Sequence, residues 1–479
     1  MSGPDDVLPQ VLARIDAQLD DSLDRLFRFL SIKSISTDPA YAEDCRVAAT
    51  SLAADLSTLD VAAEVHPTEG HPIVFAKADF APDSATNPDP TAKPAANRRR
   101  VLFYGHYDVQ PVDPLDLWDI PPFEPRIATL PDGRKVITGR GACDDKGQVM
   151  TFIEACRAWK AVTGSVPIDV TFLIEGEEEC GSKHLPGWVE AHKADLVGDV
   201  ALVCDTSMWD PKTPAITTAL RGLVYEEIKI KAADHDLHSG LFGGAAQNPI
   251  RVLAKIIAAI HEETGRITIP GFYDGVKELP AAVRTEWEGL GLTAEKFLGQ
   301  VGLSVPAGEQ GRLVIEQISS RPTCDVNGIW GGYTGEGAKT VIPAEASAKI
   351  SFRLVGAQEP AKIRDAFRAF VRARLPADCK VEFKGNSGSP AVALDWNLPQ
   401  LAEARAALTQ EWGKEALLIG SGGSIPVVGD FKRLLGIDTL LIGFGLDDDR
   451  IHSPNEKYDL ASFHKGTRSW ARILAALAA

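Results

Sequence analysis

Acidic residues and histidines follow several short apolar runs in this sequence. His106 and Asp108 come after Val101–Gly105, and Asp205 comes after Val200–Cys204. Short β-branched runs bounded by turn residues are typical of buried parallel strands, and the carboxyl ends of such strands meet at one edge of a sheet. We therefore expect these three side chains to lie close together.

Three further segments bring carboxylates or an imidazole to the same predicted edge. The run Val170–Ile174 leads into the acidic run Glu175–Glu179, and Thr439–Gly445 leads through an acidic loop to His452. Asp144 lies next to a second aspartate in a glycine-framed turn. Together these segments offer more ligands than one metal ion needs, so we expect a site for two.

Five of these side chains match the ligands that two neighbouring divalent cations require. Such a pair needs one bridging carboxylate, and one histidine and one terminal carboxylate for each ion. Mixed nitrogen and oxygen ligands favour zinc, with manganese or cobalt as alternatives, whereas magnesium and calcium normally take all-oxygen shells. We therefore predict two divalent metal ions per subunit. The predicted ligands are His106, Asp144, Glu179, Asp205 and His452.

Two more acidic residues have predicted tasks beside the ligands. Asp108 is two residues from His106 on the same strand face, where its carboxylate can accept the second ring N–H and fix the tautomer. Hydrolysis also needs a base that takes a proton from water and returns it to the leaving nitrogen. Glu178 and Glu179 are adjacent on a segment that we expect to be extended, so one can bind a metal while the other reaches the water.

Each candidate also has an ordinary structural explanation. A histidine after a strand is commonly a surface or capping residue, and Asp205 could cap a helix. Asp144 could serve only its turn, and at least two glutamates of the run Glu175–Glu179 are expected to be solvated. The occurrence of all these residues at predicted strand ends of one domain favours metal binding.

The composition is that of an acidic globular protein. The 479 residues carry a net charge of −16 with a pI near 5.2, and 44% of them are hydrophobic. The negative charge argues against nucleic acid and anionic membrane surfaces as partners. The seven cysteines form no CxxC pair, residues 1–10 contain no apolar signal-peptide core, and no apolar run approaches the length of a membrane span. We expect a cytoplasmic protein with free thiols.

The order of the predicted elements indicates an α/β fold with two domains. Residues 1–216 and 386–479 are expected to form the metal-binding catalytic domain, with a mostly parallel central sheet flanked by helices. Within it we predict one helix over Val11–Leu30 and a loop or insertion over Ala81–Asn97. Residues 217–385 predict an inserted lid and dimerisation domain with the ferredoxin-like order β-α-β-β-α-β and a partly helical insertion near residues 262–321. Its predicted strands are Leu223–Lys231, Thr323–Gly328, Ala344–Leu354 and Lys380–Lys384, and its helices are Asn248–Ile260 and Ala361–Arg374.

These motifs resemble the dinuclear-metal peptidase family that contains carboxypeptidase G2, aminoacylase-1, succinyl-diaminopimelate desuccinylase and the cytosolic nonspecific dipeptidases. The matching segments span nearly the whole chain in the family's order. They are Gly105–Pro111, Gly139–Gly147, Glu175–Ser182, Asp234–Gly244, Lys339–Pro343, Phe352–Val355, Gly422–Pro426 and Ile451–Tyr458. The motif His-Tyr-Asp-Val-Gln-Pro, among others, is similar to the dipeptidase and carnosinase branch in particular.

The resemblance implies a role for each candidate at the predicted metal site. Glu178 would be the general base, and Asp108 the supporting carboxylate. A cis peptide bond would follow Asp144. The ligands would form two sets that share Asp144, with His106 and Asp205 on one metal and Glu179 and His452 on the other.

The resemblance also implies substrate contacts, three of them from the inserted domain. His238 matches a histidine that, in related dimers, reaches the partner subunit's site and stabilises the tetrahedral oxyanion, which implies a homodimer formed through the lid domain. Arg353 would clamp the terminal carboxylate of the substrate with its planar fork of donors. Thr340 and Ser424 would contact the substrate through their hydroxyl groups.

The implied activity is hydrolysis of the amide bond of a dipeptide or similar small substrate with a free C-terminal carboxylate. The chain departs from the branch at Ser421, where an acidic residue is expected near the free α-amine. An N-acyl-amino-acid or carbamoyl amidohydrolase is therefore the alternative. A third hypothesis is a metal-dependent binding protein without catalysis, which should lack the base or the bridging acid, but Glu178 and Asp144 are both present.

Overall fold

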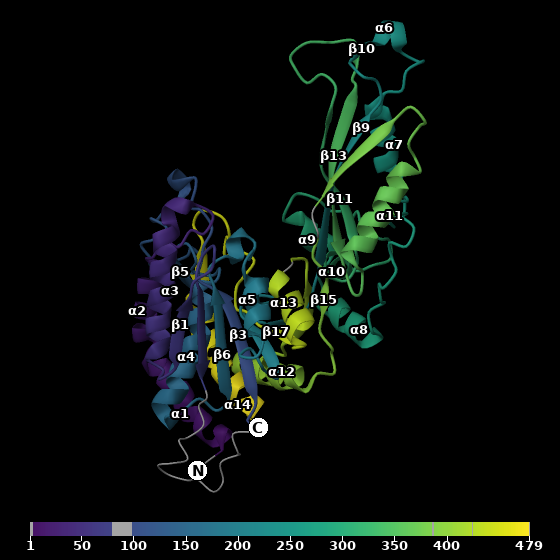
Figure 1. The fold of residues 1–479 in the computed structure, drawn as a ribbon. Helices are drawn as coiled ribbons and strands as arrows, with labels where there is room; N and C mark the ends of the chain where they lie inside the picture. Colours follow the sequence, from purple (N-terminus) through teal and green to yellow (C-terminus); the bar gives the residue numbers. More distant parts are fainter. Residues whose placement is uncertain (1–2, 79–97, 386–387, 424, 479) are drawn as a thin grey trace. The chain divides into compact units, whose positions relative to one another are not determined.

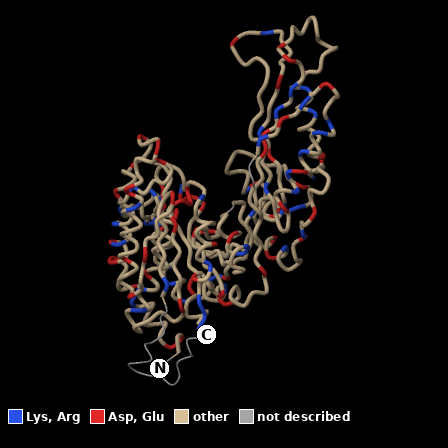
Figure 2. Tube along the Cα trace, viewed as in Figure 1, with Lys and Arg blue, Asp and Glu red and all other residues tan. Residues whose placement is uncertain are grey.

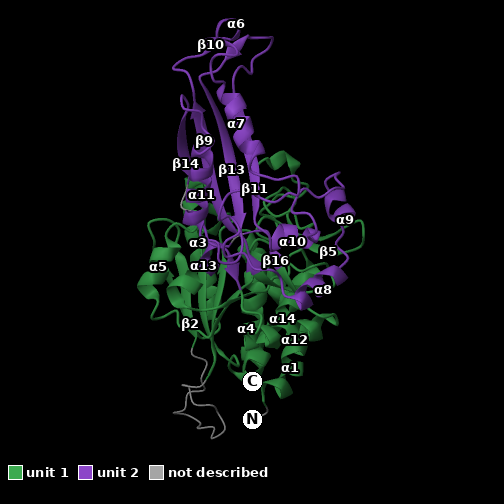
Figure 3. Ribbon diagram, turned by 90° about the vertical axis from the view of Figure 1, so that its right-hand side faces the viewer, with its two compact units in different colours: residues 1–218, 394–419, 430–479 green, residues 219–393, 420–429 purple. Residues whose placement is uncertain are grey.

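The computed structural model describes residues 3–78, 98–385, 388–423 and 425–478. The chain divides into two compact units, each with its own hydrophobic core (Figures 1 and 3). Unit 1 comprises residues 1–218, 394–419 and 430–479, and unit 2 comprises residues 219–393 and 420–429. The chain therefore passes from unit 1 into unit 2 and returns, as it does in proteins with an inserted domain.

The main sheet of unit 1 has a parallel centre. The described strands lie in the order β1-β2-β6-β3-β7-β17-β8, in which β6, β3, β7 and β17 are parallel and the outer pairs are antiparallel. The parallel strands are almost entirely buried, as their apolar runs predict. The bounds are β1 Ala62–His66, β2 Ile73–Ala78, β3 Arg100–His106, β6 Asp169–Glu175, β7 Val200–Val203, β8 Ala215–Leu220 and β17 Thr439–Leu441, and the short strands β15 Val392–Ala393 and β16 Leu417–Ser421 also pair with β8.

Alternating side chains of β3 pack on opposite faces of this sheet. Phe103 stacks on Phe152 of α4, with 3.9 Å between the ring centroids, whereas Tyr104 meets the ring of Phe431 edge-on. Both faces of the sheet are therefore covered, which is why these strands carry no polar face. The helices of unit 1 are α1 Pro4–Ala17, α2 Leu19–Leu30, α3 Ala42–Ser57, α4 Lys146–Thr163, α5 Leu185–His192, α12 Pro399–Trp412 and α14 Leu460–Ala478.

A second, small sheet of unit 1 was not predicted. Its described strands β4 (Arg126–Thr129), β5 (Lys135–Thr138) and β18 (Lys457–Asp459) are antiparallel, in the order β18-β5-β4. Because β18 begins five residues after His452, pairing with β5 anchors the segment that carries this histidine.

Unit 2 has the predicted ferredoxin-like order. Its described sheet is antiparallel, in the order β11-β13-β9-β14, and helices α7 and α11 pack against it. The predicted insertion between α7 and β11 contains three short described helices, α8, α9 and α10. The bounds are β9 Gly222–Lys231, β10 Leu237–His238, α6 Ser239–Phe242, α7 Pro249–Ala258, α8 Ala281–Gly289, α9 Ala294–Gly299, α10 Val314–Ser319, β11 Thr323–Gly331, β12 Val341–Ile342, β13 Glu345–Leu354, α11 Pro360–Arg372, β14 Lys380–Gly385 and α13 Pro426–Asp430.

The single helix predicted over Val11–Leu30 is wrong, because the chain forms two helices that separate at Gln18. This residue leaves the helical region, with φ −112° and ψ 17°. Residues on both sides of the break, including Ile15 and Leu23, are buried in the core of unit 1. The apolar faces of both helices therefore lie against the same core. The predicted loop Ala81–Asn97 lies outside the described residues.

Positive and negative side chains are interspersed along both units (Figure 2). Many of them pair, as Arg468 does with Glu411 at 2.6 Å. The net charge of −16 is therefore spread over the chain rather than confined to one segment. In the described part of the chain, no helix has both the length and the apolar character needed to cross a membrane.

Candidate metal centre

The candidate ligands converge at the carboxyl ends of the parallel strands of unit 1. His106 is the last residue of β3, and Glu179 and Asp205 follow β6 and β7. Because β6 and β7 are the two neighbours of β3, these ends meet at one edge of the sheet. Asp144 lies in the turn that leads into α4, and His452 lies in the loop after β17.

Asp144 lies at the centre of this group, and each of its carboxylate oxygens contacts a different histidine. His106 Nε2 is 3.1 Å from Asp144 Oδ1, and His452 Nε2 is 2.9 Å from Asp144 Oδ2. Asp205 lies 4.0 Å from His106 Nε2, and Glu179 lies 3.2 Å from His452 Nε2. Two three-residue groups share Asp144, and in each group the possible ligand atoms lie within 4.8 Å of one another. This mixed nitrogen and oxygen set fits two divalent cations.

The electrostatics of the cluster favour positive charge. Burial raises the pKa of Asp205 well above its usual value, and the carboxylate of Asp144 raises it further. Burial also opposes ionisation of Asp144, but hydrogen bonds from His106 and His452 lower its pKa. Hydrogen bonds to Asp144 and Glu179 raise the pKa of His452 to about 10. Protonated histidines therefore balance the carboxylates when the cluster holds no metal, and metal binding should release protons.

Glu178 lies beside this cluster, but not on the extended segment that we predicted. Glu178 and Glu179 begin a 3-10 turn, η4 (Glu178–Cys180), which closes when the Gly181 N–H donates to the Glu178 carbonyl at 2.9 Å. Successive residues of such a turn are rotated by about 120°, so the two carboxylates still point in different directions. Burial, and then the charges of Glu179, Asp108 and Asp144, raise the pKa of Glu178 to about 7 against the effect of His106. A carboxyl group that titrates near neutrality is suited to proton transfer.

Asp108 contacts the other ring nitrogen of His106. Nδ1 of His106 lies 3.4 Å from Asp108 Oδ1 and 3.1 Å from the Asp108 backbone carbonyl oxygen. The second carboxylate oxygen of Asp108 accepts the Glu179 N–H at 3.1 Å. Asp108 therefore contacts one member of each ligand group, a position from which it can orient both.

The expectation that at least two glutamates of the run Glu175–Glu179 are solvated is wrong. Glu175 and Glu177 are only 1% and 6% exposed. Glu175 accepts hydrogen bonds from the Tyr104 hydroxyl at 2.6 Å and the Ser182 hydroxyl at 2.9 Å. Glu177 accepts the backbone N–H of His184 and lies 2.9 Å from its Nδ1. These partners take the place of water, so both side chains belong to the framework that holds the η4 turn.

Glu456 is a buried residue of the site that the sequence reasoning missed. Its carboxylate accepts a hydrogen bond from Arg140 Nη1 at 2.6 Å, and both side chains are at most 1% exposed. It also accepts three backbone N–H groups of the turn that ends at Asp144, at 3.0–3.1 Å. The peptide bond after Asp144 is cis, as the resemblance implied. Glu456 thereby links the turn of Asp144 to the loop of His452. Its position four residues after His452 was the one sequence feature that could have indicated this role.

The predicted substrate-binding residues lie in unit 2, except that Ser424 lies outside the described residues. His238 is an exposed residue of β10. The N–H of Ser239 donates to the Thr340 carbonyl at 3.0 Å, so His238 and Thr340 lie on adjacent segments. Arg353 lies on β13, in the same unit. The structure thus brings His238 and Thr340 together within unit 2.

Residues 102–476 match the model of Peptidase family M20/M25/M40. The chain belongs to this family. The resemblance to the dinuclear-metal peptidases is thereby confirmed.

Individual relatives of this M20 peptidase match it over most of its length. The Cys-Gly metallodipeptidase dug1 of Schizosaccharomyces pombe is 31% identical over 97% of this chain and 97% of its own. The Beta-Ala-His dipeptidase of Homo sapiens is 28% identical over 100% of this chain and 94% of its own. The solved structure of the M20 family metallo-carboxypeptidase Sso-CP2 from Sulfolobus solfataricus has a TM-score of 0.77 and 30% identity, with 95% of this chain and 99% of that one covered. The fold of Sso-CP2 is therefore similar to the fold described above.

The glycine-rich loop of this M20 peptidase carries no acid at residues 420–423. The hydroxyl of Ser421 accepts the Gly423 N–H at 3.1 Å. The serine therefore supports the loop, and the loop presents no carboxylate there that could pair with an α-amine.

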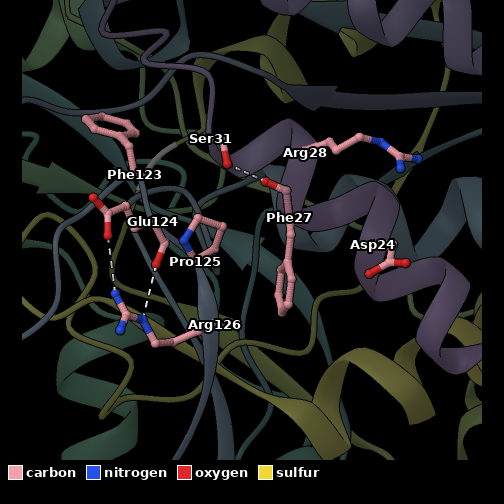
Figure 4. Close-up of a pocket in the computed structure, with 8 residues that line it drawn as sticks. All are labelled: Asp24, Phe27, Arg28, Ser31, Phe123, Glu124, Pro125 and Arg126. Carbon is pink, nitrogen blue, oxygen red and sulfur yellow. Dashed lines mark hydrogen bonds and ion pairs between the residues drawn. The ribbon is translucent and has the colours of Figure 1, made fainter.

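A cavity of about 630 Å³ in unit 1 lies between α2 and the segment that precedes β4 (Figure 4). Its polar groups contact near neighbours, since Ser31 donates to the Phe27 carbonyl and Arg126 contacts Glu124. None of the candidate ligands lines it, and we assign it no chemistry. The lining residues are Asp24, Phe27, Arg28, Ser31, Phe123, Glu124, Pro125 and Arg126.

Replacing Glu175 by glutamine should remove a pH dependence of stability. Burial raises the pKa of Glu175 to about 8, although the hydrogen bond from Tyr104 opposes this. The folded protein therefore keeps a proton that the unfolded chain releases above about pH 4.3. The stability due to this proton is complete below that pH and is lost as the pH rises towards 8. Between about pH 5 and pH 8, the wild type should lose up to about 1.4 kcal/mol more per pH unit than Glu175→Gln.

Urea unfolding of the metal-free protein across this pH range measures the effect. The matched control is Glu190→Gln, whose side chain is 52% exposed in a surface pair with Lys193, and which should follow the wild type. Equal pH dependence of the wild type and Glu175→Gln would show that Glu175 is ionised in the folded protein.

Proposed function

We propose that this protein is a two-metal dipeptidase, which hydrolyses the amide bond of dipeptides or similar small substrates with a free C-terminal carboxylate. The observation that carries the proposal is the pair of ligand groups that share Asp144 beside the half-buried acid Glu178. The relatives support it, since one is a Cys-Gly metallodipeptidase, one a Beta-Ala-His dipeptidase and one a metallo-carboxypeptidase.

The two cations would be held at the carboxyl edge of the unit 1 sheet. Zinc is favoured, with manganese or cobalt as alternatives, because each group contains an imidazole nitrogen. When bound, divalent cations lower the pKa of water and polarise a carbonyl group. The ligands would be His106, Asp144 and Asp205 for one ion, and Asp144, Glu179 and His452 for the other.

The protein's own side chains would move the proton and hold the substrate. Glu178 takes a proton from the attacking water and returns it to the departing amine, while Asp108 keeps the ring of His106 in position. Arg353 pairs with the C-terminal carboxylate of the substrate. His238 stabilises the oxyanion, and the hydroxyl groups of Thr340 and Ser424 contact the substrate.

Metal analysis combined with a substrate panel tests this function. We expect about two divalent ions per subunit, loss of activity on chelation, and recovery on adding zinc, manganese or cobalt. Dipeptides should be hydrolysed faster than N-acetyl, N-succinyl or carbamoyl amino acids. A fully loaded protein that hydrolyses none of these substrates would exclude the proposed function.

An N-acyl-amino-acid or carbamoyl amidohydrolase is the second candidate, and Ser421 is the observation that favours it. A free α-amine is best recognised by a carboxylate, and residues 420–423 offer none. Hydrolysis confined to the acylated members of the same panel would select this alternative.

We also propose that the protein is a homodimer formed through unit 2, the lid and dimerisation domain. In the described sheet, β11 is an edge strand and presents Val326, Ile329 and Trp330, which are 41%, 56% and 45% exposed. An exposed apolar edge favours pairing with a second chain, and the same surface on both subunits gives a two-fold dimer. Such a dimer would allow His238 to serve the site of the partner subunit.

Ile329→Asp should therefore convert the dimer into a monomer, because a charge would be buried in the interface. Activity should fall by at least about tenfold, since His238 would no longer reach the partner subunit's site. Analytical ultracentrifugation measures the mass. Leu303→Asp is the control, since Leu303 is 60% exposed in the helical insertion of the same unit. A monomeric variant with full activity would contradict the role of His238.

We propose a cytoplasmic location. The seven cysteines form no disulfide in the structure. Free thiols persist in a reducing compartment.

A further inference from the structure

Arg221 and Arg353 lie on the same face of the unit 2 sheet. Arg353 on β13 is directly opposite Leu223 on β9. Arg221 directly precedes β9, and continuing the alternation of that strand by one residue places Arg221 on the side of Leu223, diagonal to Arg353. Phe352 and Leu354 on either side of Arg353 belong to the buried core of unit 2, so the two arginines occupy the opposite face.

Neither arginine has an acidic partner among the described residues. No described carboxylate lies within 4.0 Å of either guanidinium group. Other arginines of this unit are paired, as Arg321 is with Glu309 at 2.8 Å and Arg368 is with Glu226 at 2.9 Å. Burial lowers the pKa of Arg221 to about 10, and the positive charge of Arg353 contributes to this. The charge of Asp325 acts on this pKa in the opposite direction, but among the described residues Asp325 forms no ion pair with either arginine. Two half-buried like charges with no acid in direct contact form a place that favours an anion.

The glycine-rich loop accepts hydrogen bonds from the Nε and the backbone N–H of Arg221. Its Nε donates to the Gly422 carbonyl at 3.3 Å, and its backbone N–H donates to the Gly423 carbonyl at 3.1 Å. A Cβ atom at Gly422 would lie 3.0 Å from Arg221 Nη2, so glycine lets the loop approach the guanidinium group closely. The Nη groups have no hydrogen-bond partner among the described residues. They remain available to a ligand.

We propose that Arg221 and Arg353 together form the site for the substrate's carboxylate, with Arg221 as a second specificity-determining residue. A carboxylate has two oxygens that can accept hydrogen bonds from two guanidinium forks at once. The pair of charges would select an anionic C-terminus over a neutral one of the same shape. The proposal holds for dipeptides and for N-acyl amino acids alike, because both carry this group, and it rests on the proposed hydrolase function.

Kinetics with a matched pair of substrates test the proposal. A substrate that the wild type hydrolyses is compared with the same molecule carrying a C-terminal carboxamide, on the wild type and on Arg221→Gln and Arg221→Lys. Arg221→Gln should lower kcat/KM for the acid by about 10–100-fold and change that for the amide by less than about threefold. Arg221→Lys should retain part of the preference, because it keeps the charge but not the fork.

A purely structural role in holding the glycine-rich loop predicts a different result. Both substrates would then lose the same factor, and an unchanged ratio of acid to amide would overturn the proposal. Arg372→Gln is the control, since Arg372 is exposed on α11 of the same unit and packs over Phe383.

Binding of the acid to Arg221→Gln in a Glu178→Gln background, measured by calorimetry, gives a readout without turnover. The dissociation constant should rise about 10–100-fold, and an unchanged constant would also overturn the proposal. Lack of activity in the wild type, by contrast, would contradict the proposed function and not this assignment.

Discussion

Glu178→Gln will lower kcat for dipeptide hydrolysis by about 10²–10⁴-fold while the metal content stays unchanged. Glutamine has the same shape but cannot accept a proton from water. Burial raises the pKa of Glu178 to about 7, which places this carboxyl group where it can both take up and release a proton near neutral pH. Glu178 is not a member of either ligand group, so both groups should still bind their ions.

Steady-state kinetics measure kcat, and elemental analysis of the same preparation measures the metal content. Glu190→Gln removes one carboxylate from the surface of unit 1 and should leave kcat unchanged. Glu178→Gln with near wild-type turnover would mean that another group is the base, and loss of metal from it would mean that Glu178 is a ligand.

Glu456→Gln will have the largest effect on stability and on metal affinity together. The substitution leaves Arg140 buried without a counter-charge, which costs about 3–5 kcal/mol in unfolding free energy. It also weakens the hydrogen bonds from the three backbone N–H groups of the turn that carries Asp144. Loss of such support for a ligand lowers metal affinity by about 10–100-fold.

Denaturant unfolding and a competition titration with a metal chelator measure these effects. The matched control is Glu43→Gln, which breaks a surface pair with Arg46 in which the glutamate is 77% exposed, and which should cost at most about 1 kcal/mol. Wild-type metal affinity in a destabilised Glu456→Gln would show that the turn keeps its shape without the carboxylate.

Local periodicity predicted the elements well where one face of an element is apolar. The predicted strand Leu223–Lys231 is β9, Gly222–Lys231, and the predicted helix Asn248–Ile260 is α7, Pro249–Ala258. The same reasoning failed at Gln18, because the apolar spacing continues across the break between α1 and α2. Periodicity indicates which residues face the core, but not whether the helix is interrupted between them.

The burial of acidic side chains was the second feature that the sequence did not predict. The run Glu175–Glu179 has the composition of a solvated segment, yet Glu175 and Glu177 are buried because Tyr104, Ser182 and His184 satisfy them. Composition indicates the cost of burying a carboxylate but not the presence of a partner that offsets it.

The sequence by itself determined which residues are candidates for the chemistry and that most of them follow strands, because strand patterning and strand ends are local properties. Only the tertiary structure decided that His106 and His452, which lie 346 positions apart, contact opposite oxygens of Asp144. It likewise decided that Glu456 supports the turn of Asp144, and that Arg353 lies near enough to Arg221 for its charge to lower the pKa of Arg221. These relations depend on strand order and on packing between distant segments, which no local pattern in the chain encodes.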